Sequence, residues 1–228
     1  MITKKEKKEY VFGRLNEILL SQGYKIFTTG GAPNCVVNQE DRAIIFYFNF
    51  LDLGDIAFSK ICISIKKVED IVFEIKKPGQ NYDMIDNKRD FLLTVIDKIT
   101  SYPEGYRDWG GYPIKTWEDI EKFTDWIIHY LEYEGKAFIE KYSYLPNILT
   151  EMDRLQSEGK YWHNIISGSE ENLFRGLIIS KLCNDIRYNE KLLFVRKAIY
   201  DEGLNDLIPY YEKLKARLES VEPIYNES

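Results

Sequence analysis

The residues best suited to chemistry in this sequence are an aspartate and a Glu-x-Lys motif downstream of it. Asp55 is followed by Glu74, Ile75 and Lys76. Two carboxylates can hold a Mg²⁺ ion, and a lysine beside them can stabilise the charge that develops on an attacked phosphate. Asp55, Glu74 and Lys76 therefore form one candidate catalytic set, for metal-dependent cleavage of a phosphodiester.

This set is similar to the loose pattern of the restriction-endonuclease-like nucleases, an Asp and then Glu-x-Lys on a core strand. A leading helix followed by strands also fits the opening of that fold. Three observations oppose the nuclease interpretation: the pattern is short, residues 68–75 also fit a helix, and the chain has 37 Asp and Glu against 31 Lys and Arg. An acidic chain without a basic stripe repels nucleic acid. We keep a Mg²⁺-dependent nuclease as the alternative function and do not expect a nucleic-acid partner.

Other catalytic and metal-binding motifs are absent from the sequence. The two histidines, His129 and His163, lack the spacing of a metal site such as H-E-x-x-H. There is no P-loop, no G-x-G-x-x-G and no nucleophile elbow, and Ser169 is best explained as the cap of a helix. We therefore expect a non-enzymatic protein with no cofactor and no metal site.

The segment 101–115 is unusually rich in aromatic residues and glycine. It contains Tyr102, Pro103, Gly105, Tyr106, Trp109, Gly110, Gly111, Tyr112 and Pro113. Aromatic side chains supply contact area, and glycines let a loop approach another backbone closely. Two interpretations are open: a recognition surface with Trp109 and Tyr112 as aromatic anchors, or a lid that covers apolar residues of the sheet.

Negative charge is concentrated in the second half of the chain. Residues 116–228 carry 21 Asp and Glu against 14 Lys and Arg, whereas residues 1–115 carry 16 and 17. Within the helix expected at 117–134, four acidic residues recur at intervals of three, four and seven, which places them on one face. They are Glu118, Glu121, Asp125 and Glu132. We expect this face either to bind a basic protein partner or to be an ordinary solvated surface.

The strands that position these segments centre on residues 42–75. The run 43–48 is apolar on both faces of an extended strand, which is typical of a central strand, and 61–65 alternates as a half-exposed strand does. Short connections favour antiparallel neighbours. The expected strands are 24–29, 34–38, 42–50, 57–66 and 91–99.

Helical patterns occupy the N-terminus and the second half of the chain. Thr116 is a good N-cap with Asp119 three residues later, and Gly23 is placed to end the first helix. The expected helices are 4–21, 68–75 (where a strand also fits), 117–134, 136–144, 147–157, 169–184, 189–202 and 209–220. The fold class is therefore α+β: an antiparallel sheet of four or five strands with an N-terminal helix (1–115), followed by a helical lobe (116–228) packed on it.

A family resemblance rests on the order of these elements and on two local sequences. These are Ile114-Lys115-Thr116-Trp117-Glu118-Asp119 and Gly135-Lys136-Ala137-Phe138-Ile139. Over about 8–155 the chain resembles a family of uncharacterised bacterial domains of unknown function, and some such α+β domains resemble immunity proteins of toxin systems. The resemblance implies a bacterial, protein-binding and immunity-like role, and it assigns no functional residues.

The location of the protein is also inferred from the sequence. The charged N-terminus is unlike a signal peptide, and no apolar run approaches the roughly 20 residues that span a bilayer. The three cysteines, Cys35, Cys62 and Cys183, are too far apart to indicate a disulfide framework or a zinc site. We expect a cytoplasmic protein without a membrane partner.

Overall fold

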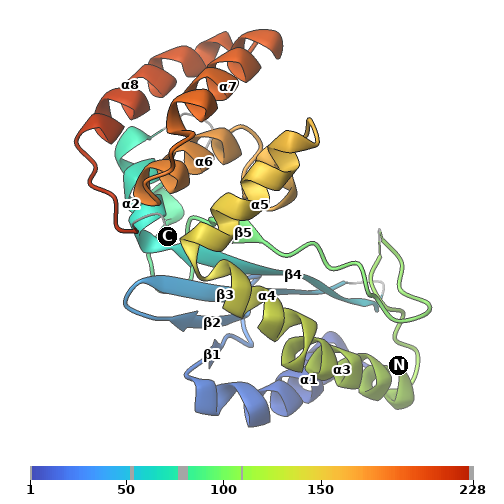
Figure 1. The fold of residues 1–228 in the computed structure, drawn as a ribbon. Coiled ribbons are helices and arrows are strands. Elements are labelled where there is room, and N and C mark those ends of the chain that lie inside the picture. Colours follow the sequence, from blue (N-terminus) through green and yellow to red (C-terminus); the bar gives the residue numbers. More distant parts are fainter. Residues whose placement is uncertain (1, 52–53, 77–81, 109, 226–228) are drawn as a thin grey trace. The chain divides into compact units, whose positions relative to one another are not determined.

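The computed structural model describes residues 2–51, 54–76, 82–108 and 110–225 of the chain. Figure 1 shows an α+β fold, and in the described residues five strands form one sheet of order β1-β2-β3-β4-β5. The strands are β1 Lys25–Ile26, β2 Cys35–Asn38, β3 Arg42–Phe50, β4 Ile56–Ile65 and β5 Val95–Ile96. The fold class expected from the sequence, an antiparallel sheet with an N-terminal helix and a helical C-terminal region, is confirmed.

The middle of the sheet follows the sequence pattern closely. β2 and β3 are antiparallel with Cys35 opposite Phe46 and Val37 opposite Ile44. Ala43 and Ile45 are fully buried, and Phe46 is 1% exposed, so both faces of β3 are covered as expected. The apolar run at the start of β3 is therefore the centre of the sheet.

The outer strands are much shorter than the expected 24–29 and 91–99. β1 and β5 have two residues each. The segment around β5 also bonds to a stretch that the sequence did not identify as extended: the Ile96 amide donates to the Ile165 carbonyl at 3.1 Å, and the Ser167 amide donates to the Thr94 carbonyl at 2.9 Å. This pairing joins residues that are far apart in sequence, so local periodicity contains no signal for it.

The chain divides into two compact units. Unit 1 comprises residues 1–63 and 97–140, and unit 2 comprises residues 64–96 and 141–228. This division differs from the boundary expected after residue 115, and it falls inside β4 and inside α4, Glu134–Tyr142.

Unit 1 contains α1, Lys4–Leu19, and α3, Trp117–Glu132, which contact each other. α1 begins with a capping box between Thr3 and Glu6, and the short 3-10 turn η1, Leu20–Gln22, ends at Gly23 with a φ of 84°. A positive φ costs glycine little, so its place at the end of the helix is as expected. The core of this unit is aromatic: it includes Phe12, Phe46, Phe48 and Phe58, linked by ring contacts such as Phe48–Phe58 at 4.8 Å.

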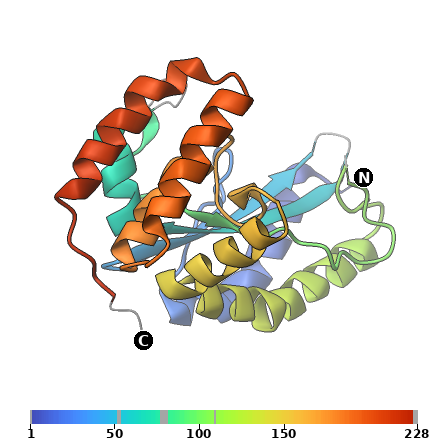
Figure 2. The same cartoon turned by 45° about the horizontal axis from the view of Figure 1, so that its top comes forward.

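Unit 2 is built around one buried helix. Its helices are α2 Lys66–Ile75, α5 Leu145–Ser157, α6 Glu171–Leu182, α7 Tyr188–Asp201 and α8 Ile208–Glu219. α6 contacts α2, α5, α7 and α8, and all of its residues except Lys181 are buried. Figure 2 shows α7 and α8 as neighbouring helices at the C-terminal end of the chain. α2 confirms the helical interpretation of residues 68–75.

A buried ion pair joins α2 to α6 in unit 2. The Arg175 guanidinium donates from Nε and Nη2 to the two carboxylate oxygens of Glu69, at 2.8 Å each. The Thr94 hydroxyl donates to the same carboxylate at 2.7 Å and accepts from the Ile65 amide at 2.8 Å. Burial acts to lower the pKa of Arg175, but the Glu69 carboxylate raises it above its usual value. Because Arg175, Glu69 and Thr94 all use their polar groups in hydrogen bonds to one another and to the backbone, we assign this ion pair the structural role of positioning α6.

The start of α6 differs from the sequence expectation. Ser169 was expected to cap this helix, but α6 begins at Glu171, and Glu170 occupies the N-cap position without a side-chain cap. The Ser169 carbonyl instead accepts a hydrogen bond from the Asn172 side chain.

In the described residues no helix is long and apolar enough to cross a membrane.

Candidate functional site

The acidic face expected on α3 is present and exposed. A capping box fixes the start of the helix, because the Asp119 amide donates to the Thr116 hydroxyl at 3.2 Å and the Thr116 amide donates to the Asp119 carboxylate at 2.7 Å. The stripe Ile120, Phe123, Ile127 and Leu131 is buried. Because this stripe faces the core, the opposite residues Glu118, Glu121, Asp125 and Glu132 are exposed. We call these four residues the acidic α3 face.

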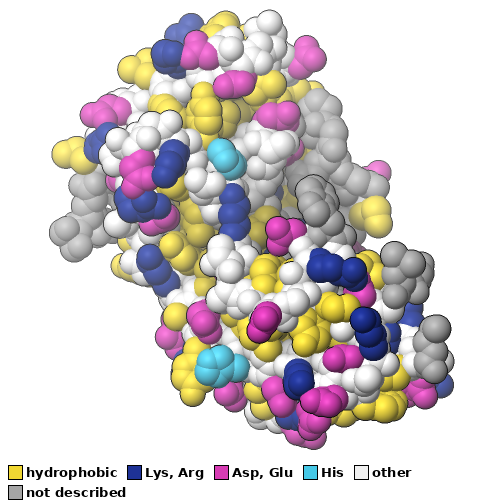
Figure 3. Space-filling view, turned by 90° about the vertical axis from the view of Figure 1, so that its right-hand side faces the viewer, with side chains coloured by type: hydrophobic (Ala, Val, Ile, Leu, Met, Phe, Trp, Pro, Cys, Tyr) yellow, Lys and Arg dark blue, Asp and Glu magenta, His cyan; other side chains and the backbone are white. Residues whose placement is uncertain are grey.

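Basic side chains reduce the charge of this face at two places. Lys122 pairs with Glu118 at 2.7 Å, and Arg14 of α1 pairs with Asp125 at 3.0 Å. These pairs are solvent-exposed, so each contributes little to stability and can exchange for a basic group of a partner. Figure 3 shows acidic and basic side chains interspersed over the surface in view rather than one uniformly acidic area.

An exposed tryptophan that the sequence patterns did not single out adjoins the acidic α3 face. The Trp117 side chain is 51% exposed, and its ring centroid lies 6.0 Å from that of Tyr10. Residues 117, 121 and 125 are spaced by four, so Trp117 shares a face with Glu121 and Asp125. The signal was available in the sequence, because Trp117 is the first residue after the N-cap and lies outside the apolar stripe.

The aromatic loop is packed against α3. Tyr102 stacks on Tyr106 with centroids 3.8 Å apart, Tyr112 stacks on Phe123 at 5.0 Å, and the Trp126 indole N–H donates to the Ser101 carbonyl at 3.0 Å. Tyr112 is partly buried. Trp109 lies outside the described residues. These contacts favour the lid interpretation of the loop over that of a freely exposed recognition surface.

Asp55 connects the aromatic loop, residues 101–115, to the start of β4. Its buried carboxylate pairs with the Arg107 guanidinium. Tyr112 exchanges two backbone hydrogen bonds with Ile56, at 2.8 and 3.0 Å, and a Cβ at Gly111 would lie only 2.6 Å from the Ile56 carbonyl oxygen. The glycine therefore permits the close approach, and Asp55 has a structural role in unit 1.

The other two residues of the nuclease alternative lie in unit 2. Glu74 is on helix α2 rather than on a strand, and its carboxylate accepts from Arg217 Nε at 2.5 Å. This hydrogen bond holds the pKa of Glu74 below its usual value. Lys76 ends α2 with a φ of 52°, and its ammonium lies over the Phe73 ring. The strand context that the motif requires is therefore missing for Glu74 and Lys76. Among the described residues no group of three or more His, Cys, Asp or Glu side chains is arranged to hold a metal ion.

Two further polar clusters belong to unit 2. Lys191 is fully buried with its ammonium 2.7 Å from Asp185 and 2.5 Å from Asp153, and the Ser180 hydroxyl donates to Asp185. Ser180 is also fully buried. Substrate has no access to Lys191 or Ser180, and the cluster connects α5, which carries Asp153, with the segment between α6 and α7.

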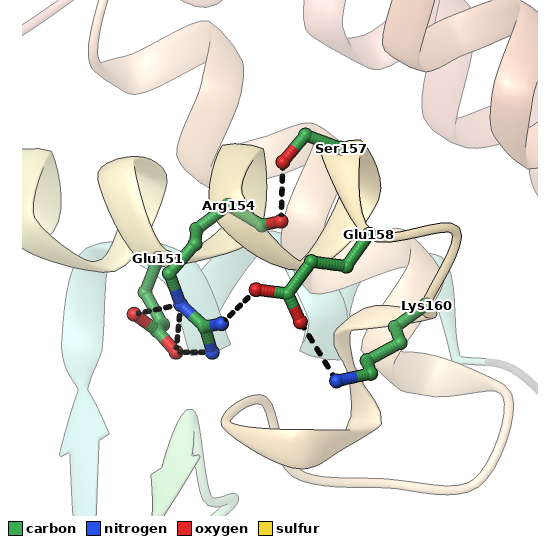
Figure 4. A network of polar contacts seen from close by, with 5 residues as sticks. All are labelled: Glu151, Arg154, Ser157, Glu158 and Lys160. Carbon is green, nitrogen blue, oxygen red and sulfur yellow. Dashed lines mark hydrogen bonds and ion pairs between the residues drawn. The ribbon is translucent and has the colours of Figure 1, made fainter.

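The second cluster is at the C-terminal end of α5 (Figure 4). Arg154 binds Glu151 and Glu158, and Lys160 binds Glu158 at 2.7 Å. The hydrogen bond from Arg154 lowers the pKa of Glu151. The positive side chain of Arg154 lies in the last turn of the helix, where it also complements the helix dipole. This exposed network is a structural feature of the C-terminal end of α5.

The fold thus defines an α+β protein in which helix α3 carries an exposed acidic face. Comparisons with protein-family models, with curated proteins and with solved structures found no match to the chain.

Proposed function

We propose that this protein acts by binding a basic protein partner through the acidic α3 face, with Trp117 as the aromatic anchor. The observation that supports this most is the exposed tryptophan, 51% accessible, on the same helical face as exposed carboxylates. Tryptophan is enriched among residues that dominate binding energy, and surrounding charges steer a complementary partner toward it.

The proposed partner presents basic residues that replace Lys122 and Arg14 at Glu118 and Asp125. Exchange of exposed ion pairs requires little reorganisation, since each is already solvated. An immunity-like inhibitor is one form of such a binder, because an acidic surface can cover the basic surface of another protein. A cytoplasmic location is part of the proposal and agrees with three buried, unpaired cysteine thiols.

Co-purification with matched baits tests this function. Wild-type protein, a Trp117→Ala variant and a Leu193→Ala control are used as baits in cells that produce the protein. Leu193 is 67% exposed on α7 in unit 2. We expect wild type and the control to retain the same basic protein and Trp117→Ala to bind it at least about 30-fold more weakly, as for an aromatic hot spot. Equal retention by Trp117→Ala would overturn the assignment of the anchor, and an acidic retained protein would overturn the charge argument.

A further inference from the structure

Unit 1 contains a pocket with an apolar floor that the proposed function does not use. It lies between the end of α1 with the η1 turn, strands β2 and β3, and the end of α3 with α4, and its volume is ≈ 310 Å³. This volume is at the lower end of the range for sites that bind small organic molecules. The apolar side chains of the floor are at most 8% exposed: Leu19, Val37, Ile44, Phe46 and Leu131.

Tyr24 supplies the polar group of this floor. The residue is 5% exposed, and its ring stacks on Phe46 with centroids 4.9 Å apart. Within the part of the chain that the structure describes, the Tyr24 hydroxyl makes no hydrogen bond. It is also not among the fully inaccessible atoms that lack a partner, so it is reached from the pocket that Tyr24 lines.

The surroundings of the Tyr24 hydroxyl favour an organic molecule over an ordered water. Buried water is held by about two to four polar partners, and the floor offers one. Burial raises the pKa of Tyr24 above its usual value, and the nearby Cys35 adds to this, so the hydroxyl stays protonated at neutral pH and can donate. A carbonyl oxygen accepts such a hydrogen bond without bringing a charge among apolar side chains.

The other polar groups of the pocket are exposed and form its rim. Lys136 pairs with Glu140 at 3.8 Å. The rim carries two carboxylates against one ammonium group, so its net charge is negative and an anionic ligand is disfavoured. The polar rim residues are Gln22, Gln39, Glu132, Lys136 and Glu140.

We propose that this pocket binds a small, neutral, mostly apolar organic molecule with one carbonyl oxygen. The carbonyl accepts the hydrogen bond of the Tyr24 hydroxyl, and the hydrocarbon part covers Val37 and Phe46. Glu132 belongs both to the rim and to the acidic α3 face, but Trp117 does not line the pocket. The proposed partner binding and this site can therefore fail independently.

Titration of the full chain with three benzene derivatives, followed by backbone amide chemical shifts, tests this site. Acetophenone carries a neutral carbonyl, ethylbenzene has no hydrogen-bond acceptor of this kind, and benzoate is anionic. We expect acetophenone to give saturable shifts at residues 18–24, 35–46 and 131–140. Benzoate should bind more weakly than acetophenone, because its charge would be desolvated beside a negative rim.

The Tyr24→Phe variant isolates the hydrogen bond. It removes a hydroxyl that makes no bond within the described chain and keeps the ring on Phe46, so we expect an unchanged fold. The dissociation constant of acetophenone should rise about fivefold, as for loss of one hydrogen bond, while that of ethylbenzene should not rise. Tyr133→Phe is the matched control, because Tyr133 is 60% exposed in the same unit and does not line the pocket.

Five results would each overturn the proposal. They are an unchanged affinity of Tyr24→Phe for acetophenone, an equal loss of affinity in Tyr133→Phe, an equal loss for ethylbenzene in Tyr24→Phe, binding of benzoate as tight as that of acetophenone, and an absence of saturable shifts. The last result would mean that the pocket holds only water.

Discussion

At the residue scale, Gly176 and Trp162 show how closely α6 is packed in unit 2. The Trp162 side chain is fully buried, and a Cβ added at Gly176 would overlap its ring. Gly13 of α1 is also helical, but a Cβ there would have no atom within 4 Å. The same substitution therefore meets opposite environments at the two positions.

We expect Gly176→Ala and Gly13→Ala to change stability in opposite directions. Overpacking at Gly176 should lower the free energy of unfolding by about 1–3 kcal/mol. At Gly13 the better helix propensity of alanine should raise it by up to about 1 kcal/mol. Urea denaturation of both variants measures the difference, and a loss of stability at Gly13 equal to that at Gly176 would contradict the packing.

Asp97 in unit 1 makes stability depend on pH. Burial raises the pKa of its carboxyl above 3.8, the nearby Glu134 charge adds to this, and the hydrogen bond donated by the Tyr130 hydroxyl opposes it. The folded state therefore binds the Asp97 proton more tightly than the unfolded state does. Its contribution is fully present below the unfolded pKa of about 3.9 and is lost as pH rises through the folded pKa.

The Asp97→Asn variant isolates this effect, because asparagine keeps an acceptor for Tyr130 and does not titrate. We expect the unfolding free energy of Asp97→Asn, relative to wild type, to be higher at pH 7 than at pH 4. Denaturant titrations at both pH values measure it. If the unfolding free energy of Asp97→Asn relative to wild type stays constant or falls between pH 4 and pH 7, then burial does not destabilise the ionised Asp97 carboxylate.

At the element scale, local sequence signals account for the helices better than for the outer strands. The Thr116–Asp119 capping box lies within four residues, so the start of α3 was predictable. β1 and β5 depend on pairing partners distant in sequence, and the predicted strands there were too long. The sequence predicted that Ser169 caps α6, because no local pattern reveals that the Asn172 side chain donates a hydrogen bond to the Ser169 carbonyl.

The cap of α3 also positions Trp117, the residue after it. We expect Thr116→Ala to lower the free energy of unfolding by about 1 kcal/mol. Thr100→Ala, at an exposed threonine of the same unit, should change it by less than about 0.5 kcal/mol. Thermal or urea unfolding compares the two, and equal effects would argue against the capping role.

At the scale of the whole molecule, the sequence predicted the fold class and the residues that share the acidic α3 face. It did not predict the division within β4 and α4, because that depends on contacts between distant segments. It also missed Trp117, since exposure follows from tertiary packing. For Asp55 and Glu74 the residue types suggested a metal site that the structure does not assemble. Asp55 pairs with Arg107 and Glu74 pairs with Arg217.

The most direct test of the proposed binding surface is the association rate of the co-purified partner at low and high salt. We compare wild type with the double variant Glu121→Lys/Glu132→Lys and with a control, Glu212→Lys/Glu219→Lys on α8. Both variants change the net charge equally. We expect the α3 variant alone to associate about tenfold more slowly at low salt, with the difference disappearing at high salt and with unchanged thermal stability. An unchanged rate, or equal slowing by the α8 control, would contradict a binding role for the acidic α3 face.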